Sequence, residues 1–343
     1  MNMVKTNIEK IKEKHPCFSN KAHFRYGRVH LPVAPKCNIQ CRYCVRSINS
    51  FEDRPGVTEK IISPLEAIEI LRDAVKQDYP LTVVAVAGPG EPLANQETFE
   101  VLEMARQEFP HLIRCIATNG LALREHAELL EKIGIRTVTV TVNAISPEIG
   151  AKVYDYVKIP PSPLCQSGVR GDFHASLRRQ TMGVNGRRYT GKEAAGILIN
   201  RQQEGVKEVI SLGMVVKINT VFIPDINGDH MIEIAKRYAE LGANIMNIVP
   251  LIPVGKFAGM RPPTHEELSS VRLACGEYIE QFTKCKQCRA DACGVPGWSN
   301  AGGRLAPGSP QMKTFPFCKG EVTRTSSFCK GEKPELPPFI KGD

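Results

Sequence analysis

The chain has 343 residues, which suits one (β/α) barrel domain of about 250 residues with extensions at its ends. Its net charge is +9, but Lys and Arg form no dense run with interleaved aromatic residues, so nucleic acid is not expected as a partner. No apolar run reaches the ~20 residues of a membrane span, so a membrane is not expected either. Twelve cysteines without a signal peptide predict a cytoplasmic protein whose thiols bind metal instead of forming disulfides.

After a charged helix at residues 1–14, apolar strands alternate with amphipathic helices. Strands are expected at 29–34, 81–87, 112–117, 137–142, 215–223 and 244–250, and helices at 65–76, 96–107, 124–133, 147–157, 191–211, 229–241 and 264–282. About six βα units with right-handed crossovers predict an α/β fold, a partial (β/α)6-type TIM barrel open at one side. We expect an N-terminal extension at 1–28, the barrel at 29–282 with a mobile insertion at 159–186, and a Cys-rich tail at 283–343.

The first strand follows a short motif that ends in Cys17. Val29, Leu31 and Val33 alternate with His30 along this strand. If the apolar side chains pack on outer helices, His30 faces the barrel interior. Both residues have two interpretations: Cys17 is a buried thiol or a ligand, and His30 is a hydrogen-bonded core residue or a metal ligand.

A loop with three thiols follows this strand directly. Cys37, Cys41 and Cys44 have the spacing Cys-x-x-x-Cys-x-x-Cys, and Tyr43 precedes the last of them. Three thiolates bind three corners of a [4Fe–4S] cluster and leave one iron open, whereas structural zinc usually takes four ligands from paired Cys-x-x-Cys units. The loop resembles that of the radical S-adenosylmethionine (SAM) superfamily. The resemblance implies that the open iron binds the amino and carboxylate groups of SAM, with Tyr43 on the cofactor side.

Three strand ends carry further candidate residues, because barrel active sites lie at the carboxyl ends of the strands. In radical SAM enzymes a Gly-rich turn here contacts the SAM amino group, which implies this role for Gly88, Gly90 and Glu91; the alternative is an ordinary βα turn. Asn119 and Asn143 end the next two strands and are also expected to bind the cofactor, Asn143 through ribose hydroxyls or a carboxylate.

Other cysteines are candidates for further clusters. Cys115 lies on a predicted strand and is either part of the core or directed into the barrel. Cys285 and Cys288 form a Cys-x-x-Cys pair, a strong indication of metal binding. Glu52 and Arg54 lie in an irregular segment and form either a surface ion pair or a polar group near the substrate. The sequence does not decide the roles of Cys318 and Cys329.

Taken together, the motifs within residues 15–158 and 187–294 resemble the NifB family of nitrogenase-cofactor maturases within the radical SAM superfamily. The resemblance implies an enzyme of lyase or transferase type with three [4Fe–4S] clusters and SAM. Such an enzyme fuses two clusters with a carbide derived from a SAM methyl group and an added sulfide into an eight-iron precursor. Its partners are an iron–sulfur donor and a scaffold or carrier protein that receives the product.

The same resemblance implies particular ligands. Residues matched to one auxiliary cluster are Cys17, Cys285, Cys288 and His30, whereas Cys115 is matched to the other cluster and Glu52 and Arg54 to positions near the substrate clusters. Family members usually have a further cysteine near Asn49 or Ser50, which is missing here.

Two other functions agree with the same cysteines. One is another radical SAM enzyme with auxiliary clusters, such as a peptide or molybdopterin maturase, although those usually place most auxiliary cysteines in a C-terminal domain. The other is a non-enzymatic iron–sulfur carrier, which would not cleave SAM.

Overall fold

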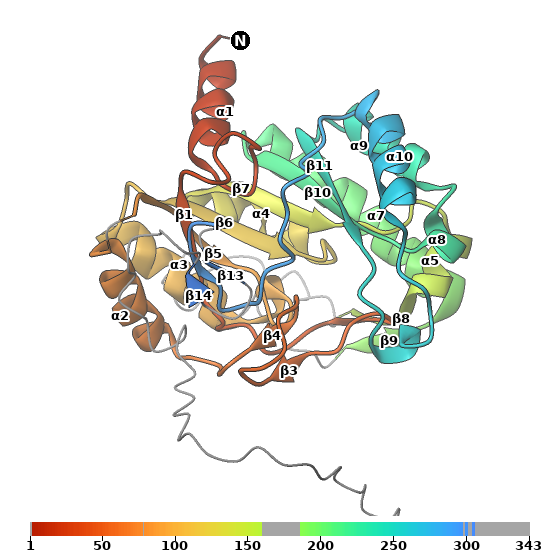
Figure 1. Cartoon of the computed structure of the whole chain (residues 1–343), viewed down its shortest axis with the longest axis horizontal. Coiled ribbons are helices and arrows are strands. Elements are labelled where there is room, and N and C mark those ends of the chain that lie inside the picture. Colours follow the sequence, from red (N-terminus) through yellow and green to blue (C-terminus); the bar gives the residue numbers. More distant parts are fainter. Residues whose placement is uncertain (1, 78, 160–185, 298, 301–303, 306–343) are drawn as a thin grey trace, which may run out of the picture.

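The computed structural model describes residues 2–77, 79–159, 186–297, 299–300 and 304–305 (Figure 1). Its centre is a curved sheet with the strand order β11-β10-β7-β6-β5-β1-β12. The parallel strands are β1 (Gly27–His30), β5 (Leu81–Val86), β6 (Ile113–Thr118), β7 (Ile135–Thr141), β10 (Val215–Phe222) and β11 (Ile245–Pro250). These agree with the six predicted strands and confirm the partial barrel.

Helices cover the outer side of this sheet (Figure 1). The helices are α2 (Pro64–Val75), α3 (Gln96–Glu108), α4 (Leu123–Lys132), α5 (Pro147–Val153), α7 (Gly191–Ser211), α8 (Pro224–Asn227), α9 (Met231–Glu240) and α10 (His265–Gly276), with short 3-10 helices η1 (Pro92–Ala94) and η2 (Gly255–Phe257). Helix α1 (Asn2–Lys14) instead projects beyond the sheet (Figure 1). Capping boxes begin α2 and α10, where Ser63 and Thr264 accept hydrogen bonds from the third helical residue. None of the described helices is long and apolar enough to cross a membrane.

Side chains along each strand point alternately to the two faces of the sheet, and their chemistry alternates in the same way. On β10, Val216 and Ile218 belong to the large core shared with the helices, whereas Lys217 and Asn219 border a cavity on the concave side. His30 on β1 also borders this cavity. Side chains two residues apart share a face of a strand, so the outer face is apolar and the inner face carries the polar residues and thiols.

Two predicted helices were too long. Residues 154–159 form strand β8 (Tyr154–Ile159), which pairs antiparallel with β2 (Ile39–Cys41) and with β9 (Arg187–Tyr189). The segment is rich in aromatic and β-branched residues, and the exposed edge of the cysteine loop provides its partner strand. Helix α10 likewise ends at Gly276, not at 282, because the following residues form backbone hydrogen bonds with β11 instead.

The segment after α10 crosses the open side of the barrel (Figure 1). Its start lies beside β11, where the Phe282 amide donates to the Met246 carbonyl at 2.7 Å. Its end, β12 (Cys293–Gly294), pairs antiparallel with β1 at the opposite edge of the parallel set. Between these ends the Ala290 amide donates to the Val57 carbonyl at 2.8 Å. The crossing therefore brings Cys285 and Cys288 to the cavity.

Short strands complete the described structure: β3 (Ser47–Ile48) with β4 (Val57–Thr58), and β13 (Ser299–Asn300) with β14 (Arg304–Leu305). Most of the insertion predicted at 159–186 lies outside the described residues, and so do Cys318 and Cys329.

Candidate iron–sulfur and SAM site

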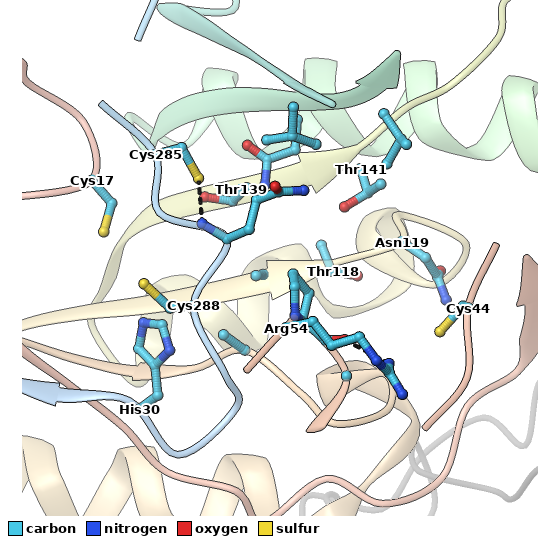
Figure 2. Close-up of a pocket in the computed structure, with 18 of the residues that line it drawn as sticks. Cys17, His30, Cys44, Arg54, Thr118, Asn119, Thr139, Thr141, Cys285 and Cys288 are labelled. Carbon is cyan, nitrogen blue, oxygen red and sulfur yellow. Dashed lines mark hydrogen bonds between the residues drawn. The ribbon is translucent and has the colours of Figure 1, made fainter. Parts of the chain in front are cut away.

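A cavity of about 330 Å³ lies on the concave side of the sheet. All sixteen site residues named from the sequence border it, except Gly88 and Glu52. Figure 2 shows the Cys44 sulfur on one side of this space and the sulfurs of Cys17, Cys285 and Cys288 on the other. Cys37 and Cys41 also border the cavity. Segments separated by more than 200 residues therefore meet at one cavity.

The three-cysteine loop is held in shape by one glutamine side chain. Gln40 Nε2 donates to the carbonyl oxygens of Cys41 at 2.9 Å and of Cys44 at 2.8 Å. Arg46 in turn donates to Gln40 Oε1 at 3.2 Å. Because both carbonyls are fixed to the same amide, the backbone turns tightly between the second and third cysteines.

The turn after β5 and the helix η2 approach the backbone of this loop so closely that a residue with a side chain does not fit at Gly90 or at Gly255. A Cβ on Gly90 would lie 2.3 Å from the Lys36 carbonyl oxygen. A Cβ on Gly255, whose φ is 62°, would lie 2.8 Å from the Arg42 carbonyl oxygen. Glycine is required at both positions because backbone atoms occupy the space of a side chain.

Burial makes the loop thiols poor acids as they stand. It raises the pKa of Cys37 to about 12, with the Glu91 carboxylate adding to the effect. Burial also raises the pKa of Cys41, and the neighbouring Cys44 and Cys37 raise it further. Burial raises the pKa of Cys44 as well. Three partly buried thiols that border one cavity fit a positively charged iron–sulfur core, because such a core stabilises thiolates that the apolar surroundings disfavour.

The described residues contain no group of three or more His, Cys, Asp or Glu side chains arranged around one metal ion. A cubane cluster differs from a single ion because each thiolate binds a different iron at a separate corner. Thiols that do not surround one ion can therefore still fit the corners of a cluster.

Glu91 is buried at the end of β5, and its carboxylate is held by neighbouring strand ends. It accepts hydrogen bonds from the Thr118 hydroxyl at 2.5 Å and the Leu93 amide at 3.1 Å on one oxygen, and from the Asn119 amide at 2.6 Å on the other. Burial raises the pKa of Glu91 to about 7, against the lowering effect of these donors. The carboxylate thus links two βα turns at the cavity wall.

The two predicted asparagines connect the cysteine loop to the strand ends. Asn119 Nδ2 donates to Asn38 Oδ1 at 2.7 Å, within the loop. Asn143 Nδ2 donates to the Tyr43 hydroxyl at 2.8 Å, and its Oδ1 accepts from the Val221 amide at 2.9 Å. Because these amides are already engaged by the protein, each orients the loop as well as bordering the cavity.

Arg54 and Glu52 form an ion pair beside the loop, with 2.9 Å between guanidinium and carboxylate. Arg54 is only 7% exposed and also donates to the Val45 carbonyl at 2.7 Å. Asn49 donates to the other Glu52 oxygen at 2.6 Å. Arg289 from the crossing segment donates to the Glu52 carbonyl, which ties this pair to the C-terminal chain.

The second sulfur group consists of Cys17, Cys285 and Cys288 beside His30 (Figure 2). Burial raises the pKa of Cys17 to about 12; Lys217 and Arg28 lower it, and the Cys288 and Cys285 thiols raise it. All three thiols border the same side of the cavity (Figure 2).

Only one ring nitrogen of His30 has a hydrogen-bond partner among the described residues. Its Nδ1 lies 3.1 Å from the Arg289 carbonyl and donates to it, which leaves Nε2 with a lone pair. Burial and the nearby Arg28 charge lower the pKa of His30 to about 4, so the imidazole is neutral at physiological pH. A neutral imidazole fixed by a carbonyl through its other nitrogen is the usual arrangement of a histidine that binds metal.

Cys115 faces the cavity from β6 and is buried, at 6% exposure. It packs in an apolar cluster that includes Phe18 and Phe282, with Cys17 and Cys285 at its edge. Of the two orientations left open by the sequence, the structure has the one directed into the barrel.

The sequence interpretation missed Arg28, Lys217, Gln40 and Gly255. Arg28 precedes His30 by two residues on β1, and Lys217 alternates with apolar residues on β10. Period-2 alternation was a signal for both, because a charged residue on the inner face of a barrel strand borders the cavity. No local pattern marks Gly255, whose contact is with a segment more than 200 residues away.

Residues 31–164 match the model of the Radical SAM superfamily. With the curved parallel sheet and the three-cysteine loop at its edge, this match defines the chain as a radical SAM enzyme. Methylornithine synthase (PylB), a solved structure, covers 81% of this chain and 76% of its own at a TM-score of 0.41 and 10% identity, which is too distant to add to the assignment.

The chain belongs to the family of FeMo cofactor biosynthesis protein NifB. It is 44% identical to the NifB of Methanocaldococcus infernus over 82% of this chain and 85% of that relative. Identity to the Methanocaldococcus jannaschii protein is 42%, over 83% and 87% of the two chains. The Klebsiella pneumoniae protein is 40% identical, and the match spans 82% of this chain but 57% of that longer relative. The family predicted from the motifs is therefore confirmed.

Proposed function

We propose that this protein acts in nitrogenase-cofactor biosynthesis by fusing two [4Fe–4S] clusters into an eight-iron precursor. The added atoms are a carbide from a SAM methyl group and one sulfide. The observation that supports this proposal is the shared cavity: both cysteine groups border the same space, so a SAM molecule at one group is adjacent to a cluster at the other.

In this proposal Cys37, Cys41 and Cys44 hold the SAM-binding cluster, which supplies the electron for SAM cleavage. Tyr43 and Asn143 orient the loop through their mutual hydrogen bond, and Asn119 does so through Asn38. The turn formed by Gly88, Gly90 and Glu91 together with the two asparagines provides the polar groups that bind SAM.

The substrate clusters have separate ligands. Cys17, Cys285, Cys288 and the Nε2 atom of His30 hold one of them, and Cys115 contributes to the other. Arg54, with its carboxylate partner Glu52, supplies a fixed positive charge between the loop and the substrate clusters. An iron–sulfur donor loads the clusters and a scaffold or carrier protein receives the product.

The test is iron counting with EPR on the anaerobically reconstituted full chain, before and after addition of SAM and dithionite. We expect about twelve irons, four for each cluster, together with 5′-deoxyadenosine and an extractable cluster product. Cys288→Ala should lose the product and about four irons but still cleave SAM, because the loop cluster remains. Cys275→Ala is the matched control, since this thiol is buried in the outer core away from the cavity.

Each alternative function predicts a different result. A protein that binds iron but forms no 5′-deoxyadenosine would be an iron–sulfur carrier. A protein that cleaves SAM without yielding a larger cluster would be a radical SAM enzyme of another kind.

A further inference from the structure

Two cationic side chains are buried at the second sulfur group. Lys217 extends from β10 and Arg28 from β1, and they are 5% and 6% exposed. Lys217 Nζ donates to the Cys17 carbonyl at 2.9 Å, and Arg28 donates to the Cys288 sulfur at 3.1 Å. Each cation therefore contacts a proposed cluster ligand from an opposite side of the barrel.

Neither cation has a carboxylate partner among the described residues. Ring faces surround Lys217, with its Nζ 4.9 Å from the Phe18 centroid and 5.4 Å from that of Phe282. The other guanidinium contact of Arg28 is the Gly294 carbonyl at 2.5 Å. Carbonyls and aromatic rings offset only part of a buried charge, and an uncompensated buried cation is costly to the fold. The missing anion must then come from what the site binds.

A buried histidine side chain provides a third hydrogen-bond donor without a partner at this site. His15 is 1% exposed and borders the cavity. Its Nδ1 accepts a hydrogen bond from the Cys17 amide at 3.1 Å, so in the neutral ring Nε2 carries the proton. This Nε2 has no hydrogen-bond partner in the described structure. A buried N–H without an acceptor is unfavourable unless a ligand accepts from it.

We propose that Lys217 and Arg28 are positioning residues that retain the cluster at Cys17, Cys285, Cys288 and His30 and raise its reduction potential. The inference rests on the proposed function, because it assumes a [4Fe–4S] cluster at this site. Three thiolates and a neutral imidazole around a doubly positive core leave one net negative charge, and reduction by one electron leaves two. The two fixed cations match the reduced state, and the unpartnered His15 N–H would be available as a further donor to the cluster.

The test compares Lys217→Met with Lys217→Arg in the anaerobically reconstituted full chain without SAM. A Cys41→Ala background removes the signal of the loop cluster, and the signal that is lost when Cys288→Ala is added to this background belongs to the auxiliary cluster at Cys17, Cys285 and Cys288. We expect Lys217→Met to shift the EPR-monitored midpoint potential of the auxiliary cluster to more negative values. A tenfold weaker affinity for the electron corresponds to about 59 mV. The same variant should lose iron faster to a chelator, and Lys217→Arg should restore both properties because it keeps the charge.

Lys236→Met is the matched control. Lys236 also lies over an aromatic ring, 4.8 Å from the Tyr278 centroid, but it is exposed on α9. Its removal should change neither the potential nor iron retention. Arg28→Met provides a second removal of charge, on the other side of the cluster, and should shift the potential in the same direction.

Unfolding of the iron-free protein distinguishes this role from a structural one. Loss of an unpaired buried cation should leave the urea midpoint of the iron-free Lys217→Met variant unchanged or higher. A lower midpoint combined with an unchanged potential would mean that Lys217 only supports packing, and the inference would be wrong. Absence of any auxiliary-cluster signal in the parent protein would instead contradict the proposed function.

Discussion

Replacing Glu91 by Gln should remove a specific pH dependence from the stability of the iron-free protein. The Glu91 carboxyl is 3% exposed, and burial raises its pKa from an ordinary 4.5 to about 7. Folding therefore takes up a proton between these two pH values. The contribution of this group to stability is largest below pH 4.5 and falls as pH rises through the folded-state pKa.

The magnitude follows from the difference between the two pKa values. At about 1.36 kcal/mol per pKa unit, the unfolding free energy should fall by roughly 3 kcal/mol across this window because of Glu91 alone. Gln has the shape of the protonated acid and does not titrate, so the variant should lack this fall. The NH₂ group of the glutamine side chain faces the backbone N–H of Asn119, which costs stability. This cost is the same at every pH, so it does not change the slope of the unfolding free energy against pH.

The assay is urea unfolding at a series of pH values between about 5 and 8, with the parent and variant compared at each value. Glu128→Gln is the control, because Glu128 is 81% exposed and only 3.9 Å from Lys132 in a surface ion pair. Such pairs contribute about 0–1 kcal/mol, and this variant should follow the parent at every pH. Parallel curves for the parent and Glu91→Gln would refute the reasoning and mean that the three hydrogen bonds keep Glu91 ionised.

Three further predictions concern the cysteine loop. Cys41→Ala should abolish 5′-deoxyadenosine formation and lower the iron count by about four; retained SAM cleavage would contradict the assignment of the loop. Tyr43→Phe removes the hydroxyl that accepts from the Asn143 side-chain N–H at 2.8 Å. It should lower the unfolding free energy, measured by urea titration, by about 1–3 kcal/mol. An unchanged unfolding free energy would mean that the Asn143 amide finds another acceptor. Gly90→Ala puts a methyl group 2.3 Å from the Lys36 carbonyl oxygen and should cost about 1–3 kcal/mol or more, with loss of SAM binding by calorimetry; a fully stable, SAM-binding variant would show that the turn moves freely.

Local patterns in the chain determined the class of protein and the direction of several side chains. The Cys-x-x-x-Cys-x-x-Cys spacing acts within one loop, and the alternation on β1 directs His30 inward, because strand geometry has a period of two. Both features depend on neighbours in sequence. The six parallel strands were predictable for the same reason.

Only the tertiary structure showed which segments far apart in the sequence contact one another. The path of residues 279–294 across the barrel depends on backbone hydrogen bonds to β11 and β1, and it alone brings Cys285 and Cys288 to Cys17. The surroundings of Lys217 likewise come from β10, the N-terminal segment and the crossing segment together. Charge compensation and close backbone approach depend on distance in space, which residue spacing along a chain does not encode.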